Sequence, residues 1–276
     1  MVEILVDSFF DTIKVFPLLF IIFFAIDFIM HKANENNKLI EKISKFDFIG
    51  GSLLGAIPQC GISVAMAKLY SNGYITLGML IAVFISGSDE ALIIIGAHPD
   101  KMMFMLKLLL IKIGIALVSG FLINLLIKEK RNRIKGCPVD CDCPKCRKSE
   151  NIFLHNLIYS LKITAFLVIT VFIINYGIDK LGEESFKTIL GTNTFLQPVY
   201  ASLIGMIPSC MSSVLLAEAF IKGAISFGSL VAGLCANTGY GVLIIVKELP
   251  PKKALKVICI AQAISILVGE VIHFLF

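Results

Sequence analysis

The stretch that decides the fold is GSLLGAIPQCGISVAMAKLYSNGYITLGMLIAVFISGSDEALIII, from Gly51 to Ile95. It aligns without a gap on Ala201 to Ile245, at a constant offset of 150 residues, and sixteen positions are identical. The identities include a matched series of Gly, Pro and Cys residues that apolar composition alone does not produce: Gly55/Gly205, Pro58/Pro208, Cys60/Cys210, Ser63/Ser213, Gly73/Gly223, Gly78/Gly228 and Ala82/Ala232. Because self-similarity at a fixed spacing indicates a repeat architecture, we interpret the chain as two copies of one unit.

The composition indicates that this duplicated chain lies in a lipid bilayer. Of its 276 residues, 57% are hydrophobic and only 16% are charged, whereas soluble domains carry roughly a quarter charged residues. Four apolar runs are long enough to cross about 30 Å of hydrocarbon as helix: Phe9 to Met30, Met103 to Ile127, Phe153 to Tyr176 and Ala254 to Phe276. Acidic Glu3 and Asp7 precede the first run, so we interpret it as a span and not as an export signal.

Each copy is predicted to contain a long helix, two broken segments and a final long helix. Pro58 and Pro208 lack the backbone N–H and clash with the preceding turn. In lipid, the carbonyls that they free must be satisfied by protein or by a water-filled cavity. Paired interruptions in corresponding positions of two halves are typical of a transporter's binding site, although two ordinary proline kinks would give the same pattern. We divide the chain into a first transmembrane repeat (1–128), a Cys-rich cytoplasmic linker (129–150) and a second transmembrane repeat (151–276).

The distribution of basic residues predicts that the two repeats are inverted. If the first broken segment of each half enters the bilayer and returns, one side receives 17 of the Lys and Arg residues and the other side receives five. If every segment crosses, the division is about ten against twelve. The positive-inside rule favours the first arrangement. We therefore expect an all-α, multi-pass protein of the inner or plasma membrane, built from two inverted repeats with broken or re-entrant helices.

The segment SGSDE at residues 86–90 places two adjacent carboxylates, Asp89 and Glu90, inside an otherwise apolar run. Its counterpart, ANTGY at residues 236–240, keeps polar oxygens but loses both acids. Ionisable groups at membrane depth are functional candidates, and a site for one ion on a near-symmetric scaffold requires such an asymmetry. Carboxylate, hydroxyl and amide oxygens suit a hard divalent cation such as Mn²⁺. The alternative is a helix end with Asp89 near water.

Two thiols, Cys60 and Cys210, lie at equivalent positions beside the proline breaks. They favour soft ions such as Zn²⁺, Cu⁺ or trivalent arsenic, although buried cysteine also behaves as a small hydrophobe. The predicted substrate-binding residues are Gln59, Cys60, Ser86, Ser88, Asp89, Glu90, Ser209, Cys210, Asn237 and Thr238, of which Asp89, Glu90, Cys60 and Cys210 are the predicted metal ligands. Further candidates for buried polar residues are Asp11, Lys14, Asp27, His31, Lys112, Asn124, Glu218, Gln262, Glu270 and His273.

The linker carries four cysteines in the pattern C-x3-C-x-C-x2-C, at Cys137, Cys141, Cys143 and Cys146. In a reducing cytoplasm disulfides are disfavoured and metal binding gains weight. The spacing is not that of a zinc ribbon, so we expect a loop that captures or senses Zn²⁺ or another soft metal rather than a stable domain. The alternative is a dispensable redox-active tail. We expect no other cofactor.

Several of these motifs resemble one family. IPQCG at residues 57–61, LIAVFISGSDEAL at 80–92, IGMIPSC at 204–210 and GAISFGSLVAGL at 223–234 are similar to stretches of the ten-span heavy-metal exporters, whose members are called arsenic efflux proteins or manganese transporters. The family is related to organoarsenical permeases. The resemblance runs through nearly the whole chain and implies an exporter, not an enzyme. Gly87, Ser209 and the histidine-free linker depart from the family pattern, which leaves the metal preference open.

The sequence therefore predicts a secondary transporter that exports a heavy-metal cation or metalloid through a midplane site between the repeats, with alternating exposure of that site. Asp89 would supply the main negative charge, and Glu90 a second ligand or a carrier of a coupling proton. No GxxxxGK[ST] motif occurs, so an ion gradient is the expected drive. The basic residues form no nucleic-acid-binding pattern, and the oligomeric state, a homo-oligomer included, stays open.

Three alternatives remain at this point. The first is a carrier for another small solute, such as an organoarsenical or an anion. The second is a metal sensor that acts through the linker. The third is an intramembrane enzyme that uses Asp89 and Glu90 as acid and base, although neither GxSxG nor HExxH is present.

Overall fold

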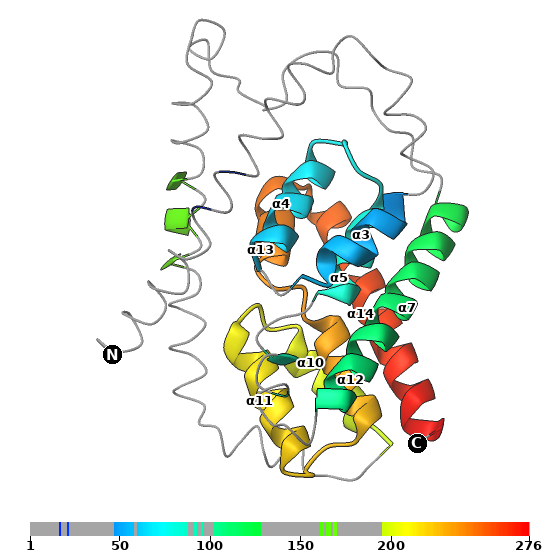
Figure 1. Ribbon diagram of the computed structural model, residues 1–276. Coiled ribbons are helices and arrows are strands. Elements are labelled where there is room, and N and C mark those ends of the chain that lie inside the picture. The colour runs from blue at the N-terminus through cyan, green and yellow to red at the C-terminus, as the bar shows by residue number, and fades with distance from the viewer. Residues whose placement is uncertain are drawn as a thin grey trace, which may run out of the picture.

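The computed structural model describes residues 47–57, 60–87, 102–127 and 195–275, together with positions 17, 21, 91, 92 and 95 and seven positions between 161 and 169. Within these ranges every regular element is a helix, which agrees with the predicted all-α class. The first half contributes α3 (Asp47–Gly55), α4 (Cys60–Ser71), α5 (Leu77–Ser86) and α7 (Met102–Leu126) (Figure 1). The second half contributes α10 (Gln197–Gly205), α11 (Cys210–Ile221), α12 (Phe227–Ala236), α13 (Gly241–Glu248) and α14 (Pro251–Leu275).

The helices repeat with the same spacing as the sequence. The bounds of α3, α4 and α5 become those of α10, α11 and α12 when 150 is added, and α7 and α14 both contain 25 residues. The break between α10 and α11 contains Pro208, and the break between α3 and α4 covers the sequence position of Pro58. Both halves are therefore interrupted as predicted: α3 and α10 end three positions before the proline of each half, which cannot continue a helix, and α4 and α11 begin two positions after it.

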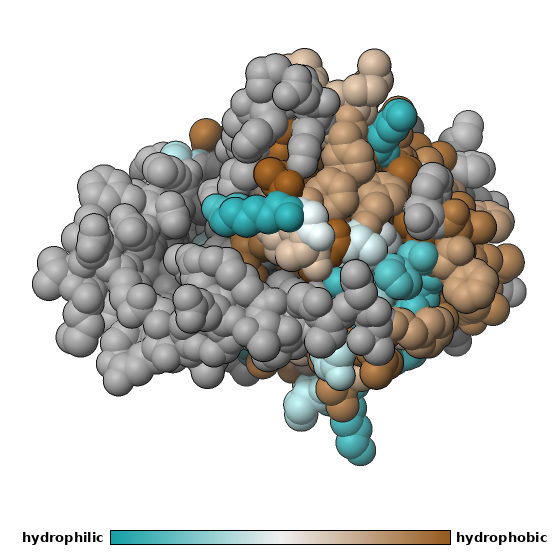
Figure 2. All heavy atoms as spheres, turned by 90° about the horizontal axis from the view of Figure 1, so that it is seen from below, coloured by the Kyte–Doolittle hydropathy of each residue, from teal (hydrophilic) through white to brown (hydrophobic). Residues whose placement is uncertain are grey.

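Two of the predicted membrane spans are present as continuous helices. Both α7 and α14 are long and apolar enough to cross a bilayer, and α12 and α13 make a third candidate as a pair bent by 41°. Large apolar side chains on α7 and α14 are exposed, including Leu110 (60%), Val118 (61%) and Leu267 (66%). On the face seen in Figure 2, hydrophobic side chains cover much of the part that is not grey. This surface suits lipid better than water. The other two predicted spans, Phe9 to Met30 and Phe153 to Tyr176, lie outside the described residues apart from isolated positions.

Helices α3 and α4 form a hairpin whose two ends lie together. Asp47, which begins α3, accepts a hydrogen bond at Oδ2 from Thr76 Oγ1 (2.8 Å). Thr76 is the N-cap of α5 and accepts from Met79 N at 3.1 Å, and α4 ends at Ser71, just before the same turn. Gly73 gives this turn its left-handed residue, with φ 75°. The segment 47–71 therefore begins and ends on one side.

The second half repeats this hairpin with different polar groups. Gln197, which begins α10, accepts at Oε1 from Ser226 N (3.0 Å) and from Ser229 Oγ (2.9 Å). Ser226 is the N-cap of α12, and Gly223 adopts φ 73° after α11. An amide thus replaces the carboxylate of the first half at the same position. Both satisfy the free N–H groups and hydroxyls of a helix start that would otherwise be unpaired away from water.

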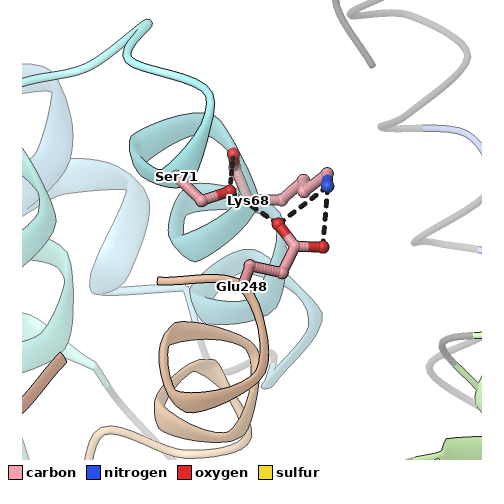
Figure 3. Close-up of polar contacts among 3 residues, drawn as sticks. All are labelled: Lys68, Ser71 and Glu248. Carbon is pink, nitrogen blue, oxygen red and sulfur yellow. Dashed lines mark hydrogen bonds and ion pairs between the residues drawn. The ribbon is translucent and has the colours of Figure 1, made fainter. Parts of the chain in front are cut away.

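The two halves contact each other through α4 and α13. Lys68 Nζ of α4 lies 2.6 Å from Glu248 Oε1 at the end of α13, and Ser71 Oγ donates to Glu248 Oε2 at 2.6 Å (Figure 3). The Lys68 and Glu248 side chains are only 12% and 17% exposed. At the other end of α13, its first residue, Gly241, packs closely on α4. A Cβ added to Gly241 would lie 2.8 Å from the carbonyl oxygen of Ser63. Helix α13 is therefore held along α4 at both ends.

Removing the charge of Glu248 tests this contact. We expect Glu248→Gln to lower the stability of the folded protein by roughly 1–3 kcal/mol, because Lys68 would lose a charge-assisted partner in a half-buried setting. The measurement is thermal unfolding of the detergent-solubilised protein. Glu218→Gln is the matched control, because Glu218 pairs with Lys222 on a surface where the two side chains are 48% and 60% exposed and such pairs contribute under about 1 kcal/mol. Equal melting temperatures for the two variants would contradict the expectation.

Candidate functional site

One buried side chain joins the second breaks of the two halves. Lys112 lies in the middle of α7 and is only 1% exposed. Its Nζ donates to the carbonyl oxygen of Gly87, the C-cap of α5, and to that of Leu234 at 3.2 Å, in the last turn of α12. The C-terminal ends of α5 and α12 therefore meet at a single ammonium group inside the protein.

The break after α12 is built by local hydrogen bonds. Asn237 caps the helix, with its backbone N–H donating to Gly233 O at 3.1 Å. Its side-chain Oδ1 accepts from Gly239 N at 2.9 Å, and Gly239 adopts φ 56°. Asparagine turns of this kind, followed by a left-handed glycine, end a helix without leaving its carbonyls to lipid. The chain then resumes as α13 at Gly241.

Two polar atoms at this break are buried with spare bonding capacity. Asn237 Nδ2 and Thr238 Oγ1 have no hydrogen-bond partner among the residues that the structure describes, although their residues are only 2% and 7% exposed. Thr238 also lines a small cavity together with Ala236 and Gln262. A buried polar group without a partner costs about 1–3 kcal/mol, so such a group in a native protein calls for a ligand, an ion or water. Asn237 and Thr238, both predicted site residues, thus lie where a ligand would satisfy them.

The predicted residues Ser86 and Ser209 lie in different breaks. Ser86 is fully buried at the end of α5, where its Oγ donates to Ala82 O at 2.8 Å and sits against Gly55 of α3. Ser209 is 3% exposed in the break between α10 and α11, and its carbonyl oxygen accepts from Ser212 Oγ at 2.7 Å. Ser86 therefore belongs to the end of α5 that Lys112 contacts, whereas Ser209 belongs to the tip of the second hairpin.

The remaining predicted residues are not described. Gln59, Ser88, Asp89, Glu90 and the linker cysteines Cys137, Cys141, Cys143 and Cys146 lie outside the described residues, as do Asp11, Lys14, Asp27 and His31. Cys60 and Cys210 begin α4 and α11, but the structure describes only their backbone. Within the described ranges no three His, Cys, Asp or Glu residues form a group that could hold a metal. The predicted metal ligands and the domain boundaries at the linker therefore stay predictions.

Three of the other polar candidates, Asn124, Gln262 and His273, are joined to neighbouring elements. Asn124 Nδ2 donates to Asp47 Oδ1 at 3.1 Å, and Gln262 Nε2 donates to Ser202 Oγ at 2.9 Å. His273 Nδ1 lies 2.6 Å from Ser226 Oγ. These bonds fix the hairpins against α7 and α14. Asp47 and Gln197, the centres of these networks, were not among the predicted residues, although they stand 150 residues apart, four positions before each aligned stretch.

The chain was compared with known proteins. The model of the family described as "Putative, 10TM heavy-metal exporter" matches residues 1–161 and 148–275. The chain belongs to this family. No curated protein and no solved structure matches it. Membership makes the chain a multi-span membrane protein of the exporter class and agrees with the resemblance found in the motifs. The description of the family names an exporter, which is a transport role.

Proposed function

We propose that this chain is a secondary carrier that exports a metal cation of the manganese class, or a metalloid, through a site where α5 and α12 end between the two halves. The observation that supports this proposal is the contact of Lys112 with Gly87 O and Leu234 O. It joins the equivalent breaks of two repeats at a buried point. Helix breaks that meet at mid-membrane are where carriers of this general design bind substrate and coupling ion.

An inverted arrangement of the repeats is part of the proposal. The bent pair α12 and α13 starts at the Ser226 turn, beside the beginning of α10, and ends at Glu248, beside Lys68 at the end of α4. The first hairpin therefore opens at one end of this pair and the second hairpin opens at the other. In Figure 1 the turn after α4 lies at the top and the turn after α11 at the bottom. Opposite openings are what inverted repeats require, and they let either side expose a central site in turn.

The chemistry of this region suits a cation that keeps part of its hydration shell. Asp89 follows Gly87 by two residues in the chain and would supply the main negative charge, with Glu90 as a second ligand or as the carrier of a coupling proton. Thr238 Oγ1 can bind a cation through a lone pair, whereas Asn237 Nδ2 can only donate. Since Nδ2 has no partner among the described residues, it would bind an oxygen of the cargo, such as a coordinated water. Hard cations commonly retain such waters.

Metal content of whole cells tests the proposal. A strain that lacks the gene should hyperaccumulate one element when it is grown with Mn, Zn, Cu, Cd or arsenite, and the intact chain should restore the normal content. A chain without residues 136–147 should restore export with altered metal dependence, since the linker is expected to tune a carrier, whereas a sensor would lose its function. Unchanged content of all five elements in the deletion strain would refute the proposal.

A second candidate is supported by the same lysine. The buried ammonium of Lys112, which contacts α12 at Leu234 O, and the donor Nδ2 of Asn237 at the C-cap of the same helix would also attract an anionic cargo, such as an organoarsenical oxyanion. Positive charge and hydrogen-bond donors are how proteins hold oxyanions. The two candidates differ in what Asp89 does, because a cation needs its charge and an anion is repelled by it.

A further inference from the structure

The position of the second half that is equivalent to Lys112 in the repeat carries a neutral residue. The buried positions of α7 and α14 correspond at an offset of 149, as Leu108/Val257, Lys112/Ala261, Ala116/Ser265 and Gly120/Gly269. The offset is supported by equivalent contacts, since an added Cβ on Gly120 would meet Ala82 and one on Gly269 would meet Ala232. Alanine therefore stands in the second half where lysine stands in the first.

The second half indicates that the fold does not need a lysine here. Ala261 is only 2% exposed and lines the small cavity that also contains Thr238. Phe84, the repeat equivalent of Leu234, lines the same cavity. In the second half, α14 therefore packs at this position with an alanine and a small cavity in place of a lysine side chain. Because a buried ammonium in a membrane is costly, its presence in one half only points to function.

The ammonium occupies a position that suits a free cation. Carbonyl groups at the C-terminal end of a helix carry partial negative charge, and two such ends, of α5 and α12, face Lys112. In carriers with broken helices, C-terminal half-helix ends of this kind coordinate the transported or coupling cation. Three charged residues of the first half have neutral equivalents in the second half. Gly239, Tyr240 and Ala261 stand there in place of Asp89, Glu90 and Lys112.

We propose that Lys112 is a tethered cation that competes with the cargo: its ammonium occupies the carbonyl pair of Gly87 and Leu234, and the exported metal ion must displace it to bind. This inference rests on the proposed export of a metal cation and adds a residue that sets affinity. A return of the ammonium to the carbonyls would help to expel the bound ion. Lys112 would therefore weaken metal binding and speed release.

Kinetics of reconstituted protein test the competition. The measurement is transport of Mn²⁺, Zn²⁺ or Cd²⁺ by protein in liposomes. Lys112→Met should lower the KM for the transported ion at least about tenfold, because the substitution removes a positive charge near the site of a cation. The maximal rate should fall as release slows. Lys112→Gln should change both values in the same direction, since it keeps hydrogen-bond donors for the carbonyls but no charge, and Lys112→Arg should stay within about twofold of the wild-type KM.

The matched control is Lys107→Met, a change of an exposed lysine on the same helix, for which we expect an unchanged KM. An unchanged KM in both Lys112→Met and Lys112→Gln, or loss of folded protein in both, would make Lys112 a structural clamp and overturn the inference. A raised KM would overturn it in favour of a lysine that attracts its cargo. Wild-type protein that moves none of the three ions would instead refute the proposed function, and with it this inference.

Discussion

Asp89→Asn is expected to abolish metal export, with transport at least about a hundredfold slower than in the wild type. The substitution keeps the size of the side chain and removes the negative charge that would offset the cost of stripping water from a cation. At the effective dielectric constant of a protein, losing one close charge from a divalent ion costs on the order of 3 kcal/mol or more. The measurement is Mn²⁺ efflux from cells or liposomes that contain equal amounts of each variant.

Glu218→Gln is the control for this result, because Glu218 lies on α11 with an exposed side chain that pairs with Lys222. It should transport at the wild-type rate. If Asp89→Asn kept full Mn²⁺ export, Asp89 would not be a ligand of the cargo. Faster export of an organoarsenical by the same variant would favour the anion carrier, because that cargo would be freed from a repelling charge.

Gly205→Ala should prevent normal folding. Gly205 ends α10 against α12, where an added Cβ would lie 2.0 Å from the carbonyl oxygen of Gly233. Backbone atoms cannot rotate away as a side chain can, so α10 and α12 would have to separate. Overpacking of this kind costs about 1–3 kcal/mol and sometimes more, and a helix contact made by small residues in a membrane has little other driving force. We expect a fall of at least about 10 °C in the melting temperature in detergent, or no folded protein.

Gly50→Ala is the matched control for this packing test. Gly50 lies on α3, the repeat equivalent of α10, and an added Cβ there would have no described atom within 4 Å. Alanine in the middle of a helix is favoured over glycine by up to about 1 kcal/mol, so the control should melt at or above the wild-type temperature. Similar melting temperatures for Gly205→Ala and the wild type would show that α10 and α12 tolerate separation.

Symmetry and its violations together explain the arrangement of the candidate site. The hairpins, caps and close glycine contacts occur in both halves, so they serve the scaffold. Buried Lys112 of α7 differs between the halves, since Ala261 stands at the equivalent position of α14. The second half packs at this position without a charge, which is why we propose a binding role for Lys112.

Much of the local structure could be predicted from the sequence. The proline breaks and the long apolar runs ending near Ile127 and Phe276 have local causes, because a helix ends where a residue lacks an N–H and continues where apolar side chains face lipid. The motifs IPQCG and SGSDE could also be recognised in the sequence, because each is a contiguous stretch of residues. The offset of 150 residues also identifies which helix of the second half is equivalent to each of α3, α4 and α5.

Only the tertiary structure decided which distant groups meet. Lys112 reaches Leu234 across 122 positions of sequence, and Lys68 reaches Glu248 across 180. In the sequence, Lys112 is one of ten polar candidates of equal rank, because periodicity indicates which face of a helix is apolar and not what packs against it. The burial of Lys112, and hence the electrostatic cost of its charge, depends on how the two halves pack together.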